Sequence, residues 1–216
     1  MRQRLPGEER RRLIIDAATE LFSKHGLKGT TTREVAKAVG ISEATIFKHF
    51  ATKEELYSAI IEGKAHAQRE HVMGVVGPLA EARDDAAFLR TLATELIARA
   101  HADPTFMRLL FFSALEGHAL ADLFFRQRVL TIDVFLGRYI ADRIATGAFR
   151  PADPLQTAWN FIGMVTFHVL LHELFGQKPP AHLTRERAVE EMVTTFLEGV
   201  RSSNGETARA AHGPPS

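Results

Sequence analysis

The chain has 216 residues, of which 45% are hydrophobic and 25% are charged, a balance typical of globular proteins rather than disordered or membrane proteins. It contains no cysteine, which excludes disulfides, thiolate metal sites and a cysteine nucleophile. Residues 1–64 hold 12 Lys and Arg against 9 Asp and Glu (net +3), and the remainder holds 15 against 17 (net −2). This small bias agrees with a nucleic-acid surface near the N-terminus, although a solvated helical face would show it too.

No apolar stretch precedes Leu13, so no signal peptide is predicted and we expect a cytoplasmic protein. The longest apolar stretch runs from Leu155 to Phe175. It is interrupted by polar residues, including His168, His172 and Glu173, that would be costly in hydrocarbon. We therefore expect neither a membrane span nor a membrane partner.

Helical periodicity runs through the whole chain and predicts an all-α fold of about nine helices, the first four ending near residue 64 or, for the fourth, near Val75. The first helix carries an apolar stripe and ends at Gly26. The stripe consists of Leu13, Ile14, Ala17, Ala18, Leu21 and Phe22.

Later helix boundaries are marked by capping residues. Asp103-Pro104 and Asp153-Pro154 each offer a side-chain acceptor followed by a proline suited to the first helical position. Gly147 and Gly176 are expected to end helices, and Thr184 to begin a last helix that reaches about Arg201. Residues 203–216 lack core residues and are predicted to form a disordered tail.

Residues Thr31-Phe50 have the pattern of a helix-turn-helix. Thr31 and Glu34 have the spacing of a reciprocal capping box, and Gly40 offers the left-handed conformation of a sharp turn. Val35, Ala36 and Val39 are expected to face inward, and Ile41 to pin the turn. Ser42 can cap the next helix, which Ile46 and Phe50 would anchor from its inner side. On this pattern alone, two packed scaffold helices are the alternative.

The uninterrupted string from Gly26 to Leu56 resembles the TetR family of transcriptional regulators. The resemblance implies a homodimer in which each subunit has an N-terminal DNA-binding domain. It also implies a C-terminal domain that binds a small effector and dimerises through its last two helices. The domains expected are 1-52 for DNA binding and 53-202 for ligand binding and dimerisation, followed by the tail.

The resemblance also implies roles for single residues in contacting DNA. Thr31, Thr32, His49 and Lys53 match phosphate contacts, whereas Glu43, Ala44, Thr45 and Lys48 match residues that face the groove. Arg33, Ser42 and Phe47 complete the predicted DNA-binding set.

Two features of the DNA-binding region remain open. The family more often has tyrosine at position 47, and Phe47 lacks the hydroxyl that would reach a phosphate. Phe47 could contact a thymine methyl or a sugar, or it could pack inward. Arg2 and Arg4 could enter a minor groove or remain solvated.

Aromatic residues are concentrated between Phe106 and Phe175, a range that contains 10 of the 15 phenylalanines. They could line a cavity for a small, largely hydrophobic effector or fill a core without a cavity. The predicted effector-binding residues are Phe88, Leu92, Phe111, Leu115, His118, Phe125, Phe135, Trp159, Met164, Phe167 and His168. Arg108, Glu116, Asn160 and His172 could also orient a ligand.

His168 and His172 share one helical face, as zinc ligands can, but their order around Glu173 differs from the His-Glu-x-x-His motif and no third ligand is evident. We expect neither a metal nor another cofactor. A histidine pair at a helix-pairing surface is the favoured interpretation.

Dimerisation is expected through the helices at Leu155 to Phe175 and Thr184 to Arg201. The predicted interface residues are Ala158, Gly163, Leu171, Met192, Phe196 and Val200, and Phe167 is a further apolar residue of the same two helices. Alternatively, these residues could pack only within the monomer.

The favoured function is a repressor that binds a double-stranded, pseudo-palindromic DNA operator and is released by its effector. A DNA-binding structural or accessory protein without an effector is the alternative. The sequence has no nucleophile elbow, phosphate-binding glycine loop or dinucleotide fingerprint, so an enzyme is not expected.

Overall fold

The computed structural model describes residues 7–117 and 130–202. Within these residues the protein is all-α, with nine α-helices, one π-helical segment and a single β-bridge between Phe149 and Arg201. The predicted fold class is confirmed. None of the described helices is both long and apolar enough to cross a lipid bilayer.

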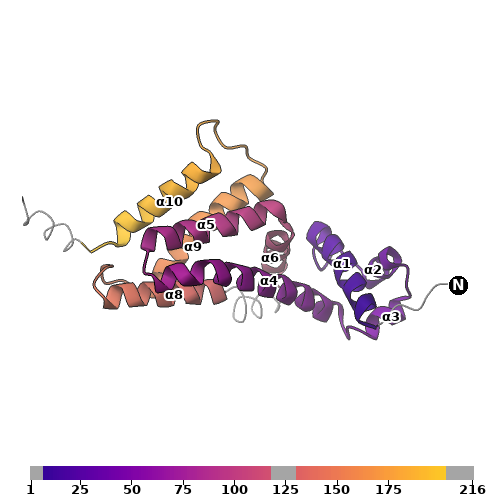
Figure 1. Ribbon diagram of the computed structural model, residues 1–216. Helices are drawn as coiled ribbons and strands as arrows, with labels where there is room; N and C mark the ends of the chain where they lie inside the picture. Colours follow the sequence, from indigo (N-terminus) through magenta and orange to yellow (C-terminus); the bar gives the residue numbers. More distant parts are fainter. Residues whose placement is uncertain (1–6, 118–129, 203–216) are drawn as a thin grey trace, which may run out of the picture. The chain divides into compact units, whose positions relative to one another are not determined.

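The chain divides into two compact units, the first made of Met1–Glu70 and Ala102–Val129. It contains α1 (Gly7–His25), α2 (Thr32–Val39), α3 (Glu43–Phe47), the start of α4 (Lys53–Glu81) and α6 (Thr105–Leu115) (Figure 1). Apolar residues recur every three or four positions in these helices, so each helix has one apolar face. These faces pack together and form the core of the unit. The largest buried side chains are Ile14, Phe22, Leu27, Ile46, Phe50, Leu56, Tyr57 and Ile60.

α6 is part of this first unit. Leu109 is completely buried in the core, and its carbonyl accepts a 2.5 Å hydrogen bond from the hydroxyl of Tyr57 on α4. Lys28, in the loop after α1, donates its backbone N–H to the Glu116 carboxylate at 3.2 Å and its ammonium to the Glu116 carbonyl at 2.8 Å. The C-terminal end of α6 is thereby attached to the loop that precedes α2.

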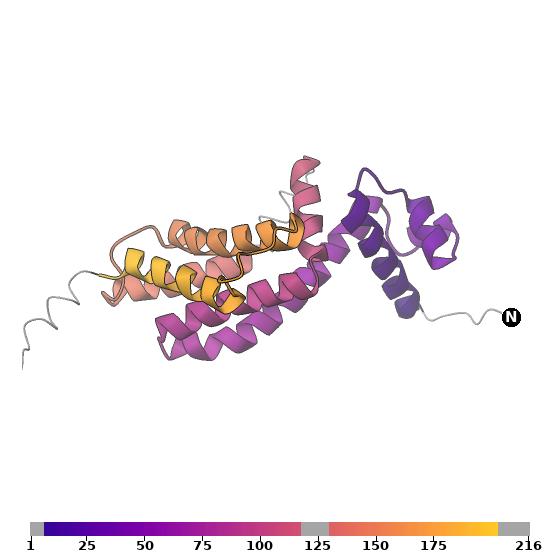
Figure 2. The ribbon, with the colours of Figure 1, turned by 90° about the horizontal axis from the view of Figure 1, so that it is seen from above.

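The second unit consists of His71–His101 and Leu130–Ser216. It contains the end of α4, α5 (Asp85–Ala102), α8 (Leu130–Ala145), α9 (Pro154–Val169), the π-helical segment η2 (Leu170–Leu174) and α10 (Arg185–Val200). α8 and α9 lie side by side in both ribbon views (Figures 1 and 2). Gly137 on α8 lies next to Leu155 on α9, and a Cβ at this position would be in ordinary van der Waals contact, 3.7 Å from the Leu155 Cα.

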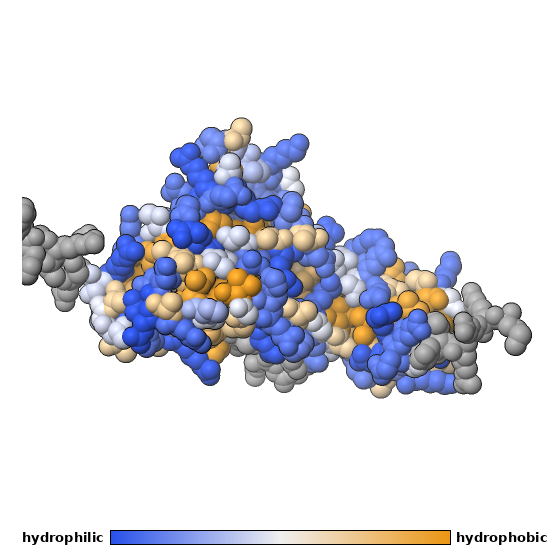
Figure 3. Space-filling view, viewed as in Figure 1, coloured by the Kyte–Doolittle hydropathy of each residue, from blue (hydrophilic) through white to orange (hydrophobic). Residues whose placement is uncertain are grey.

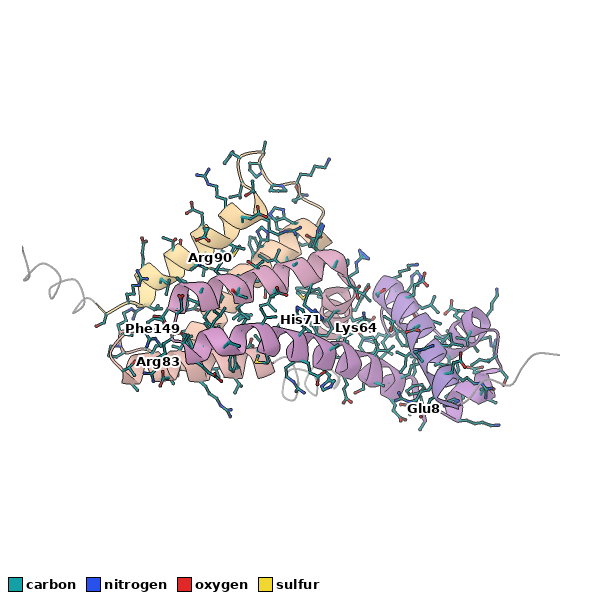
Figure 4. The ribbon with its side chains drawn as sticks, viewed as in Figure 1. Glu8, Lys64, His71, Arg83, Arg90 and Phe149 are labelled. Atoms are coloured by element: carbon teal, nitrogen blue, oxygen red, sulfur yellow. The ribbon has the colours of Figure 1, made fainter. Side chains whose placement is uncertain are left out.

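Ion pairs and aromatic contacts join the helices of the second unit. Arg90 on α5 pairs with Glu190 on α10, and Arg83, after α4, pairs with Asp142 at 3.0 Å; both arginines are labelled in Figure 4. The rings of Phe161 on α9 and Phe196 on α10 have centroids 5.0 Å apart. On the face in view, hydrophilic side chains border the apolar patches of this unit (Figure 3).

Most predicted helix ends are confirmed. Gly26, Gly147 and Gly176 all have positive φ angles and lie one or two residues after the end of a helical segment. Asp153 accepts from the N–H of Gln156 at 2.7 Å, and Thr184 accepts from that of Arg187 at 3.2 Å.

The fourth helix is longer than predicted. α4 continues beyond Val75 through Gly77 and Pro78 to Glu81. Val72 and Val76 are completely buried, and Pro78 lies in the last turn. Burial of this apolar face therefore outweighs the weak helix propensity of the glycines.

Some predictions concern residues outside the described ranges: Arg2, Arg4, His118, Phe125 and the tail 203–216.

Candidate nucleic-acid interface

The predicted capping box at the start of α2 is present. The Thr31 hydroxyl accepts from the Glu34 N–H at 3.2 Å, and the Glu34 carboxylate accepts from the Thr31 N–H at 2.7 Å. The same carboxylate also accepts the Thr31 hydroxyl proton at 2.8 Å. The hydrogen bond from the Thr31 backbone, followed by that from its hydroxyl, lowers the pKa of Glu34. The N-terminus of α2 is therefore locally fixed.

The turn between α2 and α3 has the predicted geometry. Gly40 has φ 75° and ψ 35°, and its N–H donates to the Ala36 carbonyl at 2.9 Å. Left-handed backbone costs a residue with a Cβ about 1–2 kcal/mol, which explains glycine at this position. Val35 and Ala36 are buried, and on the other side of the turn Ile46 and Phe50 are each 1% exposed. These anchors leave the opposite face of α3 free.

Ala44 and Phe47 lie on the accessible face of α3, and the exposed Lys48 follows at its C-cap. Thr45 on α3 and His49 after it are partly exposed. Phe47 has 48% of its surface exposed. The alternative in which Phe47 packs inward is therefore wrong, because Ile46 and Phe50 already occupy the inner side of this helix.

Ser42 occupies the N-cap position of α3, but its side chain does not cap the helix as predicted. Its hydroxyl lies 2.8 Å from the Thr45 hydroxyl instead. The Thr45 N–H already donates to the Ser42 backbone carbonyl at 2.9 Å, so it does not require the Ser42 hydroxyl as an acceptor.

Glu43 is the first residue of α3, and its carboxylate turns back toward α2. It accepts a short hydrogen bond from the Thr32 hydroxyl, and its other oxygen lies 3.9 Å from the Arg33 Nε. The Arg33 side chain is 88% exposed. Three predicted DNA-binding residues thus meet at the junction of α2 and α3.

Lys53, at the start of α4, is partly buried. Its ammonium donates to the Leu27 carbonyl at 2.7 Å and to the Thr30 carbonyl at 3.0 Å. Lys53 therefore fixes the loop between α1 and α2, a contact that the sequence pattern did not predict.

Arg11 is a basic residue at this end of the unit that the sequence reasoning missed. Its guanidinium lies 4.7 Å from the centroid of the Phe50 ring, next to the end of α3. The run Arg10-Arg11-Arg12 and its position on the first helix are the sequence features that could have indicated this residue.

The predicted effector-binding residues are divided between the two units. Phe88 and Leu92 are completely buried in the second unit, where the ring centroids of Phe88 and Phe135 are 6.0 Å apart. Met164 and His168 are partly buried there, whereas Trp159 and Phe167 are 43% and 61% exposed. Phe111 and Leu115 belong to α6 in the first unit, and Leu115 is 82% exposed. The set therefore does not belong to a single unit.

Of the further residues expected to orient a ligand, Arg108 and Asn160 are exposed, Glu116 bonds Lys28, and His172 is partly buried. His172 Nδ1 lies 2.6 Å from the Gln177 carbonyl, and its ring centroid is 4.5 Å from that of His168. Burial lowers the pKa of His168, and the neighbouring His172 adds to this effect. Within residues 7–117 and 130–202, no group of three or more His, Cys, Asp or Glu is arranged to hold a metal ion.

The predicted dimer-interface residues include three that are buried within the single chain. Ala158 is 0%, Phe196 6% and Val200 7% exposed, and the Phe196 ring of α10 packs on Phe161 of α9. Leu171 and Met192 are partly exposed, and Gly163 is exposed. The apolar surface that α9 leaves uncovered instead carries Leu155, Trp159 and Phe167 at intervals of four or eight residues.

Comparison with known proteins decides the family. The family model of the bacterial regulatory proteins of the TetR family matches residues 14–60. The model of the AefR-like transcriptional repressor C-terminal domain matches residues 87–199, more than half of the chain. The chain belongs to the TetR family. The members of this family are transcriptional regulators with a DNA-binding helix-turn-helix, not enzymes.

Individual TetR-family proteins are similar over different lengths. The HTH-type transcriptional repressor Rv1474c of Mycobacterium tuberculosis is 34% identical over 104 residues, which are 46% of this chain and 55% of the repressor. The structure of AibR in complex with isovaleryl coenzyme A and operator DNA has a TM-score of 0.67 at 25% identity, covering 86% of this chain and 97% of AibR. The fatty acid degradation regulator FadR of Bacillus halodurans has a TM-score of 0.69 at 20% identity, covering 90% and 97%, and so shares the fold.

Proposed function

We propose that this TetR-family protein is a homodimeric repressor that binds a pseudo-palindromic operator through α3 and is released by a small, largely hydrophobic effector. The observation that supports this most is the free face of α3, which Ile46 and Phe50 hold from behind. A short helix presented in this way suits a major groove about 12 Å wide. We assign residues 1-52 to DNA binding and 53-202 to effector binding and dimerisation.

The exposed residues divide into two kinds of DNA contact. Ala44, Thr45, Phe47 and Lys48 face the groove, where Phe47 can contact a thymine methyl and Lys48 a guanine edge. Arg33, His49 and the backbone N–H groups in the first turn of α2 contact phosphates. The side-chain protons of Thr31 and Thr32 already bond carboxylates, and the Thr31 N–H bonds Glu34, so we assign the phosphate contact to the Thr32 backbone N–H.

The uncovered face of α9 is the surface that we assign to dimerisation. Leu155, Trp159 and Phe167 supply an apolar stripe, and the exposed Gly163 between them allows a second helix to approach closely. Two recognition helices about 34 Å apart would read half-sites one helical turn apart.

The effector is a ligand with an apolar body that enters the aromatic second unit near Phe88 and Phe135. AibR, which shares the fold at 25% identity, was solved with isovaleryl coenzyme A and operator DNA. An acyl thioester is therefore a suitable first class of compound to test. The effector must bind the DNA-incompetent state more tightly, because equal affinity for both states would shift nothing.

The test is to select bound DNA from a random pool and to measure affinity for the selected site by fluorescence anisotropy. We expect a two-fold-related consensus, and we expect Lys48→Ala to weaken binding at least about fivefold if Lys48 reads a base. Lys178→Ala is the matched control, because both lysines are exposed but Lys178 lies in the second unit. Absence of any enriched site would contradict the proposal.

Effector action is tested on the same complex with a series of acyl thioesters and free fatty acids. Release of the selected DNA by one class, at saturating concentration, supports the repressor mechanism. Unchanged operator affinity across a broad apolar compound library would instead favour a DNA-binding accessory protein without an effector.

A further inference from the structure

Glu43 occupies the first position of the recognition helix, where a side chain can reach base edges, yet both of its carboxylate oxygens are directed to α2. One oxygen accepts from the Thr32 hydroxyl and the other lies 3.9 Å from the Arg33 Nε. Thr32 is the first residue of α2, and Arg33 follows it. A single carboxylate therefore connects the N-terminal ends of the two helices of the helix-turn-helix.

This arrangement has an electrostatic reason. A carboxylate directed at DNA would be repelled by the phosphates, and direct readout by glutamate is restricted to the cytosine N4 donor. Directed at α2, the same group satisfies the Thr32 hydroxyl and attracts the exposed Arg33 guanidinium to the junction of α2 and α3. To read a base, Glu43 would first have to give up both contacts.

We propose that Glu43 is a positioning residue that sets the angle of α3 against α2 and places Arg33 for a phosphate, and that it does not read a base. This inference rests on the proposed DNA-binding function. It assigns base preference to Ala44, Thr45, Phe47 and Lys48 and leaves Glu43 with none. The Arg33 guanidinium is shared between Glu43 and the DNA backbone, so the charge of Glu43 limits affinity.

The contact is tested first without DNA, by a double-mutant cycle on the full chain with Thr32→Val, Glu43→Ala and the double variant. Urea unfolding should show that the two changes are not additive, with a coupling of at least about threefold in the unfolding equilibrium constant. Additive effects would overturn the proposal. This measurement does not depend on DNA, so it is separate from any failure of the wild type to bind an operator.

The role in recognition is tested by repeating the random-pool selection with Glu43→Gln and Glu43→Ala. Both variants should return the wild-type consensus. Glu43→Gln keeps an acceptor for Thr32 but removes the negative charge, so it should bind the operator about two- to tenfold more tightly at low salt. Glu43→Ala should bind less tightly than Glu43→Gln, because α3 is then no longer held.

Glu198→Gln removes the same charge from an exposed position on α10 and should leave operator affinity within about twofold of wild type. A change of consensus at one base pair in both Glu43 variants would show direct readout and overturn the proposal. Equal affinities for Glu43→Gln and Glu43→Ala would also overturn it, since the acceptor would then have no positioning effect.

Discussion

Single charged residues fix the geometry of the DNA-binding unit in ways that their residue type alone does not indicate. The Lys53 ammonium bonds two carbonyls of the loop before α2, and Lys28 bonds Glu116 at the end of α6. Lysines that would be assigned to phosphate contacts on the basis of their charge alone therefore also donate hydrogen bonds to backbone carbonyls. Substituting such a residue changes stability and DNA affinity together.

Lys53→Met should therefore lower the free energy of unfolding by about 1–3 kcal/mol, because two carbonyls lose a charged donor. Operator affinity should fall as well. The dependence of operator affinity on salt concentration should also weaken, but by less than the loss of one phosphate contact would cause. Urea unfolding with and without DNA measures both effects. Lys178→Met, at an exposed position, is the control; equal stabilities of the two variants would refute the structural role of Lys53.

Asp133 on α8 is a second residue whose surroundings govern its chemistry. It is 7% exposed, and burial raises its pKa above the ordinary value of 3.8, while a hydrogen bond from Trp159 has a smaller, opposite effect. A carboxyl with a raised folded-state pKa stabilises the fold below the unfolded-state pKa, and this contribution is lost as pH rises through the folded-state pKa.

We therefore predict that Asp133→Asn becomes more stable relative to wild type as the pH rises from about 4 to 7. Melting temperatures across this range measure the difference. Asp16→Asn, at an exposed position on α1, should show no such trend. A constant difference between Asp133→Asn and wild type at every pH would contradict the burial of an ionisable group.

At the scale of the elements, α2, the turn and α3 form one unit because each end is fixed locally. The capping box fixes the start of α2, Gly40 ends it, and the buried Ile46 orients α3. α3 has only 5 residues and cannot persist by itself, so its position depends on these contacts.

Gly40→Ala should consequently destabilise the protein by about 1–2 kcal/mol and weaken operator binding, since the left-handed turn no longer suits the residue. Gly74→Ala is a matched control within α4, where no atom lies within 4 Å of the added Cβ. It should stabilise the protein by about 0.5–1 kcal/mol. Thermal unfolding of both variants checks the opposite signs, and a loss in both would contradict the interpretation.

At the scale of the whole molecule, the uncovered apolar stripe of α9 bears on the proposed dimer. Phe167 is 61% exposed, whereas the neighbouring Phe161 is completely buried against Phe196. One face of α9 thus belongs to the core and the other is available to a second copy.

Phe167→Lys should convert the dimer to monomers, with a loss of operator affinity of about tenfold or more, because a lysine ammonium cannot be buried unpaired at an apolar contact. Sedimentation at several protein concentrations measures the dissociation. Ala141→Lys adds the same charge at an exposed position of α8 and should leave the dimer intact. A dimer that survives Phe167→Lys would place the interface elsewhere.

The sequence by itself determined the all-α fold, most helix boundaries and the helix-turn-helix. These features depend on contacts between residues at most a few positions apart, such as Thr31 with Glu34 or Asp153 with Gln156. Caps, glycine turns and apolar periodicity act over one helical turn, so a linear pattern is sufficient to predict them.

Only the tertiary structure decided which way Glu43 turns, what Lys53 holds and which residues of α9 remain uncovered. The Thr32–Glu43 bond spans 11 residues, the Lys53 bonds 23 and 26, and the Tyr57–Leu109 bond 52. Ala158 and Phe167 look equally suited to an interface in the sequence, yet one is buried and the other is exposed. Contacts at such separations depend on how helices pack, and packing selects one face of a helix where the sequence offers several.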